Sequence, residues 1–162
     1  MKGAETIVVH NIPPVFDSNS ETLILGSIPS PKSRKEGFFY AHPQNRLWRI
    51  LAEVFEEEVP VTIEQKKTFL FKNRIAMWDV LASCDIEGSA DNTIKNAVAN
   101  DFSIIFNTAN IRQVFTTGNT AAYYYKKLTG NESVRLPSPS PLNCAVSFEK
   151  LVSEYMVLLH LS

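Results

Sequence analysis

The fold is decided by one stretch of the chain, LILGSIPSPKSRKEGFFYAHPQNRLW, which runs from Leu23 to Trp48. With Thr22 it opens on TLILG, a short apolar run closed by glycine that is typical of a central parallel strand. It ends in the first turn of a predicted helix, Asn45–Phe55, whose apolar residues recur at helical spacing and whose candidate N-cap is Asn45. A loop rich in prolines, cations and aromatics separates the two elements. A loop of this composition directly after a buried strand contains more polar and aromatic residues than a simple reversal of the chain needs.

Segments that look like strands alternate with segments that look like helices over the rest of the chain. The predicted strands are Arg74–Leu81 (strand, then turn), Ile111–Thr117 and Ser133–Leu136. The predicted helices are Ile63–Phe71, Asp91–Asn100, Thr120–Leu128 and Ser147–Leu161, while Asn100–Thr108 fits either state. This order predicts an α/β fold: a three-layer α/β/α sandwich around a central, mostly parallel four-stranded sheet, with residues 1–162 as one domain.

Two unusual loops follow predicted strands. The first lies in the opening stretch, and the second is LPSPSPLN, Leu136–Asn143, after the last strand. In open α/β sheets, ligands bind beyond the carboxyl ends of the strands. Both loops therefore belong to the same edge of the sheet, where they predict one composite site.

Composition excludes several classes of protein. The 162 residues are 44% hydrophobic, which suits one domain with a true core. A net charge of −1 argues against a protein held to nucleic acid by bulk charge, although Lys32, Arg34 and Lys35 form a local basic cluster. No run approaches the roughly 18 apolar residues of a membrane span, and Met1–His10 lacks a secretory pattern. Two isolated cysteines fit a reduced, cytoplasmic protein without a membrane partner.

Three motifs in register resemble the uracil-DNA glycosylase superfamily: GSIPS at 26–30, FYAHPQNRLW at 39–48 and PSPSPLN at 137–143. Within this superfamily, the chain is most similar to the hypoxanthine-DNA (deoxyinosine) glycosylases. Its segment Ile75–Ile94 also resembles the middle segment of those enzymes. The mismatch-specific uracil/thymine glycosylases are the next most similar group. The resemblance extends from about Leu23 to Leu161. It implies a monofunctional enzyme that flips a deaminated base, above all hypoxanthine, out of DNA and hydrolyses its N-glycosidic bond. It further implies a DNA partner, a monomer and no cofactor.

The resemblance assigns a set of residues to the flipped base. Tyr40 matches the position whose ring stacks on the extruded base. Negative charge develops on the leaving base, and backbone N–H groups of a tight turn can stabilise it, as in an oxyanion hole. An ordinary strand-ending turn is the alternative for this loop. The predicted substrate-binding residues are Gly26, Ile28, Pro29, Ser30, Tyr40 and Ser138.

The main difference from the mismatch-specific relatives is the residue at position 28, which is Ile in this chain. Mismatch-specific relatives have Asn there to position the attacking water, and Ile can neither orient nor deprotonate water. The deoxyinosine glycosylases also lack that group, and their catalytic Asn corresponds to Asn45. An amide has no useful basicity, so Asn45 would orient water or bind the base, besides capping its helix. Ser27 and His42 complete the predicted catalytic set, with His42 either a general acid or structural.

The second loop has the composition of a wedge. Prolines stiffen it, and Leu142 is an apolar tip that could fill the gap left by a flipped nucleotide. Ser138 stands where mismatch-specific relatives have Asn, which leaves selectivity for uracil or thymine open. The predicted DNA-binding residues are Lys32, Arg34, Lys35, Arg46, Ser140, Pro141, Leu142 and Asn143.

Other functions remain open at this level. A uracil or G:U/T mismatch-specific glycosylase is the nearest alternative. A non-catalytic nucleic-acid-binding domain on the same fold is supported by Ile28, and a nucleoside hydrolase is opposed by the wedge loop. His10, His42 and His160 are scattered and Cys84 and Cys144 are isolated, so we expect no metal site and no iron–sulfur cluster.

Overall fold

The computed structural model of the protein describes residues 5–87 and 90–159. Its centre is a four-stranded sheet in the order β3-β2-β6-β7, in which each pair of neighbours is parallel. The strands are β2 (Thr22–Gly26), β3 (Ile75–Asp79), β6 (Gln113–Thr117) and β7 (Val134–Leu136). Every residue of β2 is buried, as an interior strand with both faces covered requires. The predicted central parallel sheet is confirmed.

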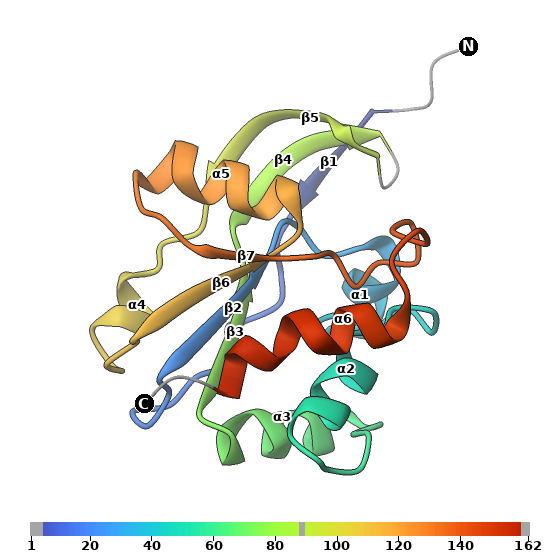
Figure 1. The fold of residues 1–162 in the computed structure, drawn as a ribbon. Helices are drawn as coiled ribbons and strands as arrows, with labels where there is room; N and C mark the ends of the chain where they lie inside the picture. The colour runs from blue at the N-terminus through green and yellow to red at the C-terminus, as the bar shows by residue number, and fades with distance from the viewer. Residues whose placement is uncertain (1–4, 88–89, 160–162) are drawn as a thin grey trace.

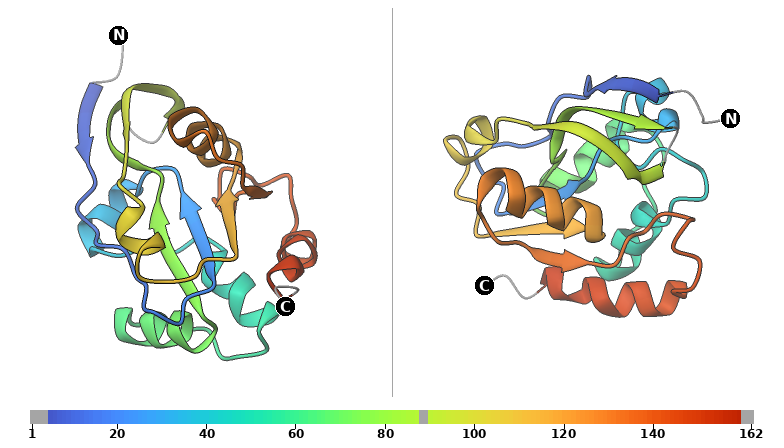
Figure 2. Two further views of the ribbon diagram at one scale, coloured as in Figure 1. Left: turned by 90° about the vertical axis from the view of Figure 1, so that its left-hand side faces the viewer. Right: turned by 90° about the horizontal axis from the view of Figure 1, so that it is seen from above.

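Helices cover one face of this sheet (Figures 1 and 2). They are α2 (Leu47–Val54), α3 (Ile63–Lys72) and α6 (Phe148–Tyr155), the last continued by a 3-10 turn, Met156–Leu159. Ile24, Met77 and Phe115 pack from the sheet into the same buried cluster as the apolar residues of these helices. The predicted closing helix Ser147–Leu161 is therefore α6 and its 3-10 extension, and residues 160 and 161 lie outside the described part.

A second sheet, which the sequence did not predict, covers part of the opposite face. It is antiparallel, in the order β1-β4-β5, with β1 at Glu5–Val9, β4 at Leu81–Glu87 and β5 at Ala90–Ala99. Helices α4 (Ser103–Phe106) and α5 (Asn119–Thr129) complete the layer (Figure 1). Leu23, Leu25 and Val114 pack from the central sheet into this second core.

The predicted helix Asp91–Asn100 was wrong, because this segment is β5. Its few apolar residues, Ile94 and Ala97 among them, fit helical spacing, but they pack against the second core from a strand. Backbone pairing with β4, from Leu81 opposite Ala99 onward, decides the conformation over the weak local pattern. The ambiguous segment after it forms the short helix α4, preceded by Asp101, whose carboxylate accepts the Ser103 N–H.

The opening loop contains a short helix that the sequence reading also missed, α1 at Pro31–Glu36. Ser30 caps it by accepting the Ser33 N–H at 3.1 Å, and Gly37 ends it in the left-handed region at φ 77°. The Ser33 hydroxyl accepts the N–H of Ala41 at 3.1 Å, which ties the following aromatic segment to this helix. The loop is therefore a built element, and it sets the position of Tyr40. Among the described residues, no helix is both long and apolar enough to cross a membrane.

Candidate active site

A cavity of about 350 Å³ lies at the carboxyl edge of the central sheet, between the two loops. This volume falls within the range of about 300–1,000 Å³ that is usual for small-molecule sites. The cavity brings Tyr40, Asn45 and the 138–142 loop together, as the sequence predicts. The predicted residues that line it are Gly26, Ser27, Ile28, Pro29, Ser30, Arg34, Tyr40, His42, Asn45, Ser138, Ser140, Pro141 and Leu142. Lys32, Lys35, Arg46 and Asn143 are not part of its lining.

Tyr40 forms one wall of the cavity in a strained backbone conformation. Its φ of 52° is left-handed, a state that costs a non-glycine residue on the order of 1–3 kcal/mol. The hydroxyl is held by a 2.8 Å hydrogen bond with the Thr117 hydroxyl, at the end of β6. Burial first, and the charge of Asp79 second, raise the pKa of this phenol above its usual 10.0. Tyr40 is thus a neutral, fixed ring, suited to stacking.

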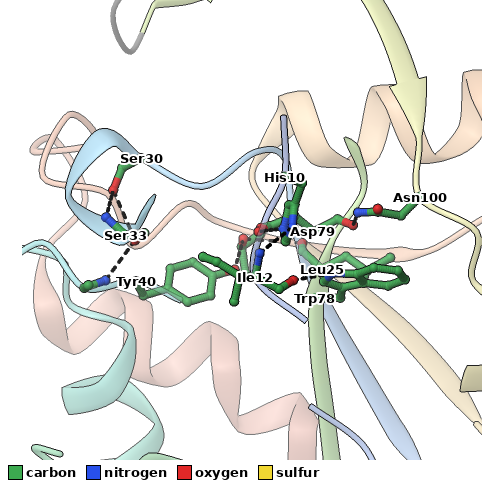
Figure 3. Close-up of polar contacts among 11 residues, drawn as sticks. His10, Ile12, Leu25, Ser30, Ser33, Tyr40, Trp78, Asp79 and Asn100 are labelled. Carbon is green, nitrogen blue, oxygen red and sulfur yellow. Dashed lines mark hydrogen bonds and ion pairs between the residues drawn. The ribbon is translucent and has the colours of Figure 1, made fainter. Parts of the chain in front are cut away.

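Asp79 lies at the floor of the cavity, and it is not among the site residues that the sequence predicts. It ends β3 directly beside Gly26, which ends β2. A Cβ atom on Gly26 would come within 2.4 Å of Asp79 Oδ1 and 3.0 Å of the Tyr40 hydroxyl, so this close approach requires glycine. The other carboxylate oxygen lies 2.8 Å from His10 Nε2 (Figure 3). The rule that ligands bind at the carboxyl ends of neighbouring strands could have indicated Asp79.

The turn after β2 presents backbone donors. The carbonyls of Gly26 and Ser27 accept the N–H groups of Val80 and Leu81 at 2.8 and 3.0 Å, which fixes the turn against β4. Within the described chain, the N–H groups of Ile28 and Ser30 have no hydrogen-bond partner. Both residues line the cavity, so these groups are available to an anion, as the resemblance implies.

Asn45 caps helix α2 and also lines the cavity. Its Oδ1 accepts the N–H of Leu47, the first residue of α2, at 2.9 Å. The formal N-cap is Arg46, whose side chain makes no cap contact, so the helix begins one residue later than predicted and Asn45 supplies the missing acceptor. Its amide Nδ2 has no partner in the described chain and is free to donate within the cavity that Asn45 lines.

His42 is an exposed residue of the cavity rim. Its Nδ1 accepts the N–H of Gln44 at 3.1 Å, and its carbonyl accepts the N–H of Asn45 at 2.9 Å. These contacts shape the turn that carries Asn45. They favour the structural reading of His42, and its part in catalysis stays a prediction.

Arg46 holds the second loop together from inside. Its guanidinium donates to the carbonyls of Val146, Ser140 and Asn143 at 2.7, 3.2 and 2.9 Å. Its backbone N–H donates to the carbonyl of Pro139 at 3.1 Å. The structure thus gives Arg46 a role in loop shape, whereas the sequence suggested a contact with DNA phosphates.

The loop that Arg46 holds ends in an apolar tip. The Asn143 side chain donates to the Ser138 carbonyl at 2.9 Å, and Ser140 Oγ accepts the Leu142 N–H at 3.1 Å. Leu142 itself is 80% exposed. A rigid loop with one exposed leucine is the geometry that a wedge requires, and its insertion into DNA stays a prediction.

The basic cluster is divided between several environments. Arg34 lines the cavity, while Lys35 is exposed. Lys32 pairs with Glu36, one turn along α1, at 2.9 Å, and because this ion pair is exposed, solvent screens it and it contributes little to stability. Contacts of these cations with DNA stay predictions. The described residues contain no group of three or more His, Cys, Asp or Glu side chains that could hold a metal, and His160 lies outside them.

Comparison with known proteins identifies the class. A family model of the uracil DNA glycosylase superfamily matches residues 13–158, nearly the whole chain. The chain therefore belongs to the uracil DNA glycosylase superfamily. It is 36% identical over 114 residues to a hypoxanthine DNA glycosylase of Methanosarcina barkeri, covering 69% of this chain and 72% of that one. It is 35% identical over 141 residues to a hypoxanthine DNA glycosylase of Methanosarcina acetivorans, covering 85% and 89% respectively.

A solved structure is similar as well. The solution NMR structure of a candidate uracil DNA glycosylase from Methanosarcina acetivorans superimposes with a TM-score of 0.78 at 32% identity. The match covers 96% of this chain and 100% of that one. The fold described above is thus the fold of the superfamily, with the cavity at the sheet edge where the two motif loops meet.

Proposed function

We propose that this protein is a DNA repair glycosylase that flips deaminated bases out of DNA, with hypoxanthine as the preferred base, and hydrolyses the N-glycosidic bond to leave an abasic site. The observation that carries the proposal is the convergence of Tyr40, Asn45 and the 138–142 loop around one cavity. The names of the two Methanosarcina relatives support hypoxanthine over uracil.

The arrangement of residues around the cavity suits a reaction in which the base leaves the sugar. The base must leave the duplex before its glycosidic bond is accessible, and the exposed Leu142 is placed to occupy the gap. Within the cavity the base stacks on Tyr40. As the bond breaks, negative charge on the base is stabilised by the free N–H groups of Ile28 and Ser30 and by Asn45 Nδ2. Ile28 offers no group to activate water, so the chemistry depends on stabilising the leaving base.

A panel of duplexes tests the proposal. Each carries one hypoxanthine, uracil, xanthine or mismatched thymine, and base release is read as alkali-labile abasic sites at enzyme excess. We expect hypoxanthine to be released fastest, with no strand cleavage before alkali, because no amine nucleophile occupies the motif positions. Fastest release of uracil or mismatched thymine would favour the mismatch-specific alternative. Binding to damaged duplex without release of any base would favour a non-catalytic domain, for which Ile28 is the supporting feature.

We further propose that the enzyme acts as a monomer in the cytoplasm. The supporting observation for the cytoplasm is that Cys84 and Cys144 are both free thiols. Sedimentation of the purified protein with and without a DNA duplex tests the oligomeric state.

A further inference from the structure

A buried pair of side chains lies beneath the cavity, and half of it comes from outside the family motifs. His10 precedes residue 13, where the family match begins. Its Nε2 lies 2.8 Å from Asp79 Oδ2, and the two side chains are only 2% and 5% exposed. Figure 3 shows this contact, and Asp79 carries it to the cavity, because Asp79 is part of the cavity lining.

The contacts of His10 fix the position of its proton. Its Nδ1 accepts the backbone N–H of Ile12 at 3.3 Å. A ring nitrogen that accepts a hydrogen bond carries no proton, so the proton of the neutral ring is on Nε2 and is donated to Asp79. The ring is held between Phe39 and Trp78, with centroid distances of 6.2 and 6.1 Å. His10 is therefore a donor of fixed direction toward Asp79.

This donor leaves one carboxylate oxygen free. Asp79 Oδ2 is taken by His10, while Oδ1 has no hydrogen-bond partner in the described chain. Oδ1 lies directly over Gly26, at the cavity floor, where only the absence of a side chain on Gly26 makes room for it. The neighbouring Tyr40 phenol is neutral and is already hydrogen-bonded to Thr117. The cavity floor thus presents one unpaired carboxylate oxygen of fixed direction, and the described lining holds one further carboxylate, that of Asp91.

An acceptor of this kind distinguishes hypoxanthine from adenine and uracil from cytosine. Deamination of adenine turns N1 from a lone-pair acceptor into an N–H donor, and deamination of cytosine does the same at N3. A carboxylate oxygen accepts from such an N–H group and repels a ring-nitrogen lone pair. A buried acceptor that is left unpaired is costly, so a base without the N–H group is disfavoured.

We propose that His10 is a positioning residue for base selection, which holds the Asp79 carboxylate so that Oδ1 receives the ring N–H of a deaminated base. The inference rests on the proposed function and deepens it. In this proposal the base is selected through the contact between His10 in the N-terminal segment and Asp79 at the end of β3, and not through the 138–142 loop.

Two matched variants test the inference. His10→Phe keeps an aromatic ring between Phe39 and Trp78 but removes the donor, whereas His10→Gln keeps an N–H that can reach Asp79. Base release is measured on duplexes with hypoxanthine or with unsubstituted purine, which lacks the N1 proton. We expect His10→Phe to lower kcat/KM for hypoxanthine on the order of tenfold or more, with a much smaller effect on purine. His10→Gln should restore most of the hypoxanthine/purine ratio.

Several outcomes would overturn the inference. One is an unchanged hypoxanthine/purine ratio in His10→Phe. Another is an equal loss on both bases, which would assign the carboxylate to water activation. Should His10→Phe fail to fold, ¹⁵N NMR of the wild-type imidazole decides: an Nδ1–H tautomer or an imidazolium at neutral pH refutes the inference. Wild-type protein that releases no base from any lesion refutes the proposed function itself, and this inference with it.

Discussion

Arg46 at the start of α2 donates a 2.7 Å hydrogen bond to the carbonyl of Val146, 100 residues further along the chain. This contact, with those to Ser140 and Asn143, makes one side chain the internal brace of the second loop. Arg46 thereby connects the 39–48 motif with the 137–143 motif. A substitution at Arg46 should therefore change the position of one motif relative to the other.

Arg46→Lys keeps the charge but cannot span the three carbonyls. We expect base release to fall about tenfold or more, because the loop loses its fixed shape, while the salt dependence of DNA binding stays unchanged. Fluorescence anisotropy over a salt series measures this dependence. In Arg46→Gln, which removes the charge, a slope reduced by about 1 would instead show a phosphate contact, as the sequence first suggested. The exposed Arg112→Lys is the matched control.

Two variants can separate the observed cap that Asn45 provides for α2 from its predicted donation to the base. Asn45→Asp keeps the oxygen that caps α2 but loses the Nδ2 donor, whereas Asn45→Ala loses both. We expect both variants to release the base at least about tenfold more slowly, because each loses one hydrogen bond to the negative charge that develops on the leaving base. Only Asn45→Ala should lose stability, by about 1 kcal/mol in urea unfolding. Wild-type turnover in Asn45→Asp would exclude the donor from the mechanism.

Leu142 is expected to act only when the lesion is in a duplex. Because this side chain is 80% exposed, Leu142→Ala should change the free energy of unfolding by less than about 0.5 kcal/mol. Release from duplex DNA should fall severalfold, while release from single-stranded DNA is maintained, since there is no gap to fill. Parallel assays on the two substrates measure the difference. Val61→Ala, at 75% exposure and away from the site, is the control, and an equal loss on both substrates would contradict the wedge.

The partly buried Tyr40 links the free energy of unfolding to alkaline pH. Its pKa is raised above 10.0 by burial and by Asp79, so the folded protein keeps a proton that the unfolded chain releases above about pH 10. Stability from this group is therefore complete below pH 10 and falls above it, by about 1.4 kcal/mol per pH unit. Urea unfolding from pH 9 to 11.5 should show a shallower decline for Tyr40→Phe than for wild type. The exposed Tyr123→Phe is the control, and identical slopes for all three proteins would contradict the prediction.

The central sheet was predictable because each of its strands is a short apolar run closed by a glycine, a turn or a proline-rich loop. The second sheet was not, because β5 carries too few apolar residues to specify its conformation alone. Its structure depends on pairing with β4, and that pairing is a tertiary property. The short helix α1 was missed for a related reason, since its N-cap Ser30 was read only as part of a binding turn.

The site divides in the same way. Its walls were predictable, because Tyr40, Asn45 and Leu142 belong to motifs that are contiguous in sequence. At its floor, the place of Asp79 at the end of a predicted strand was a usable signal, but its pairing with His10, 69 residues away, was not predictable. Burial and a shared hydrogen bond, which only the fold creates, reveal them as a pair. Arg46 is a similar case. Its charge suggested a contact with DNA phosphates, and its hydrogen bonds to carbonyls far along the chain are visible only in the fold.

The position of His10 has a practical consequence for protein engineering. A shortened version that begins at residue 13, the first residue of the family match, would retain every strand of the central sheet and every recognisable motif. It would nevertheless leave Asp79 buried without its imidazole partner. Chimeras and trimmed variants of this enzyme should accordingly preserve the segment upstream of the family boundary.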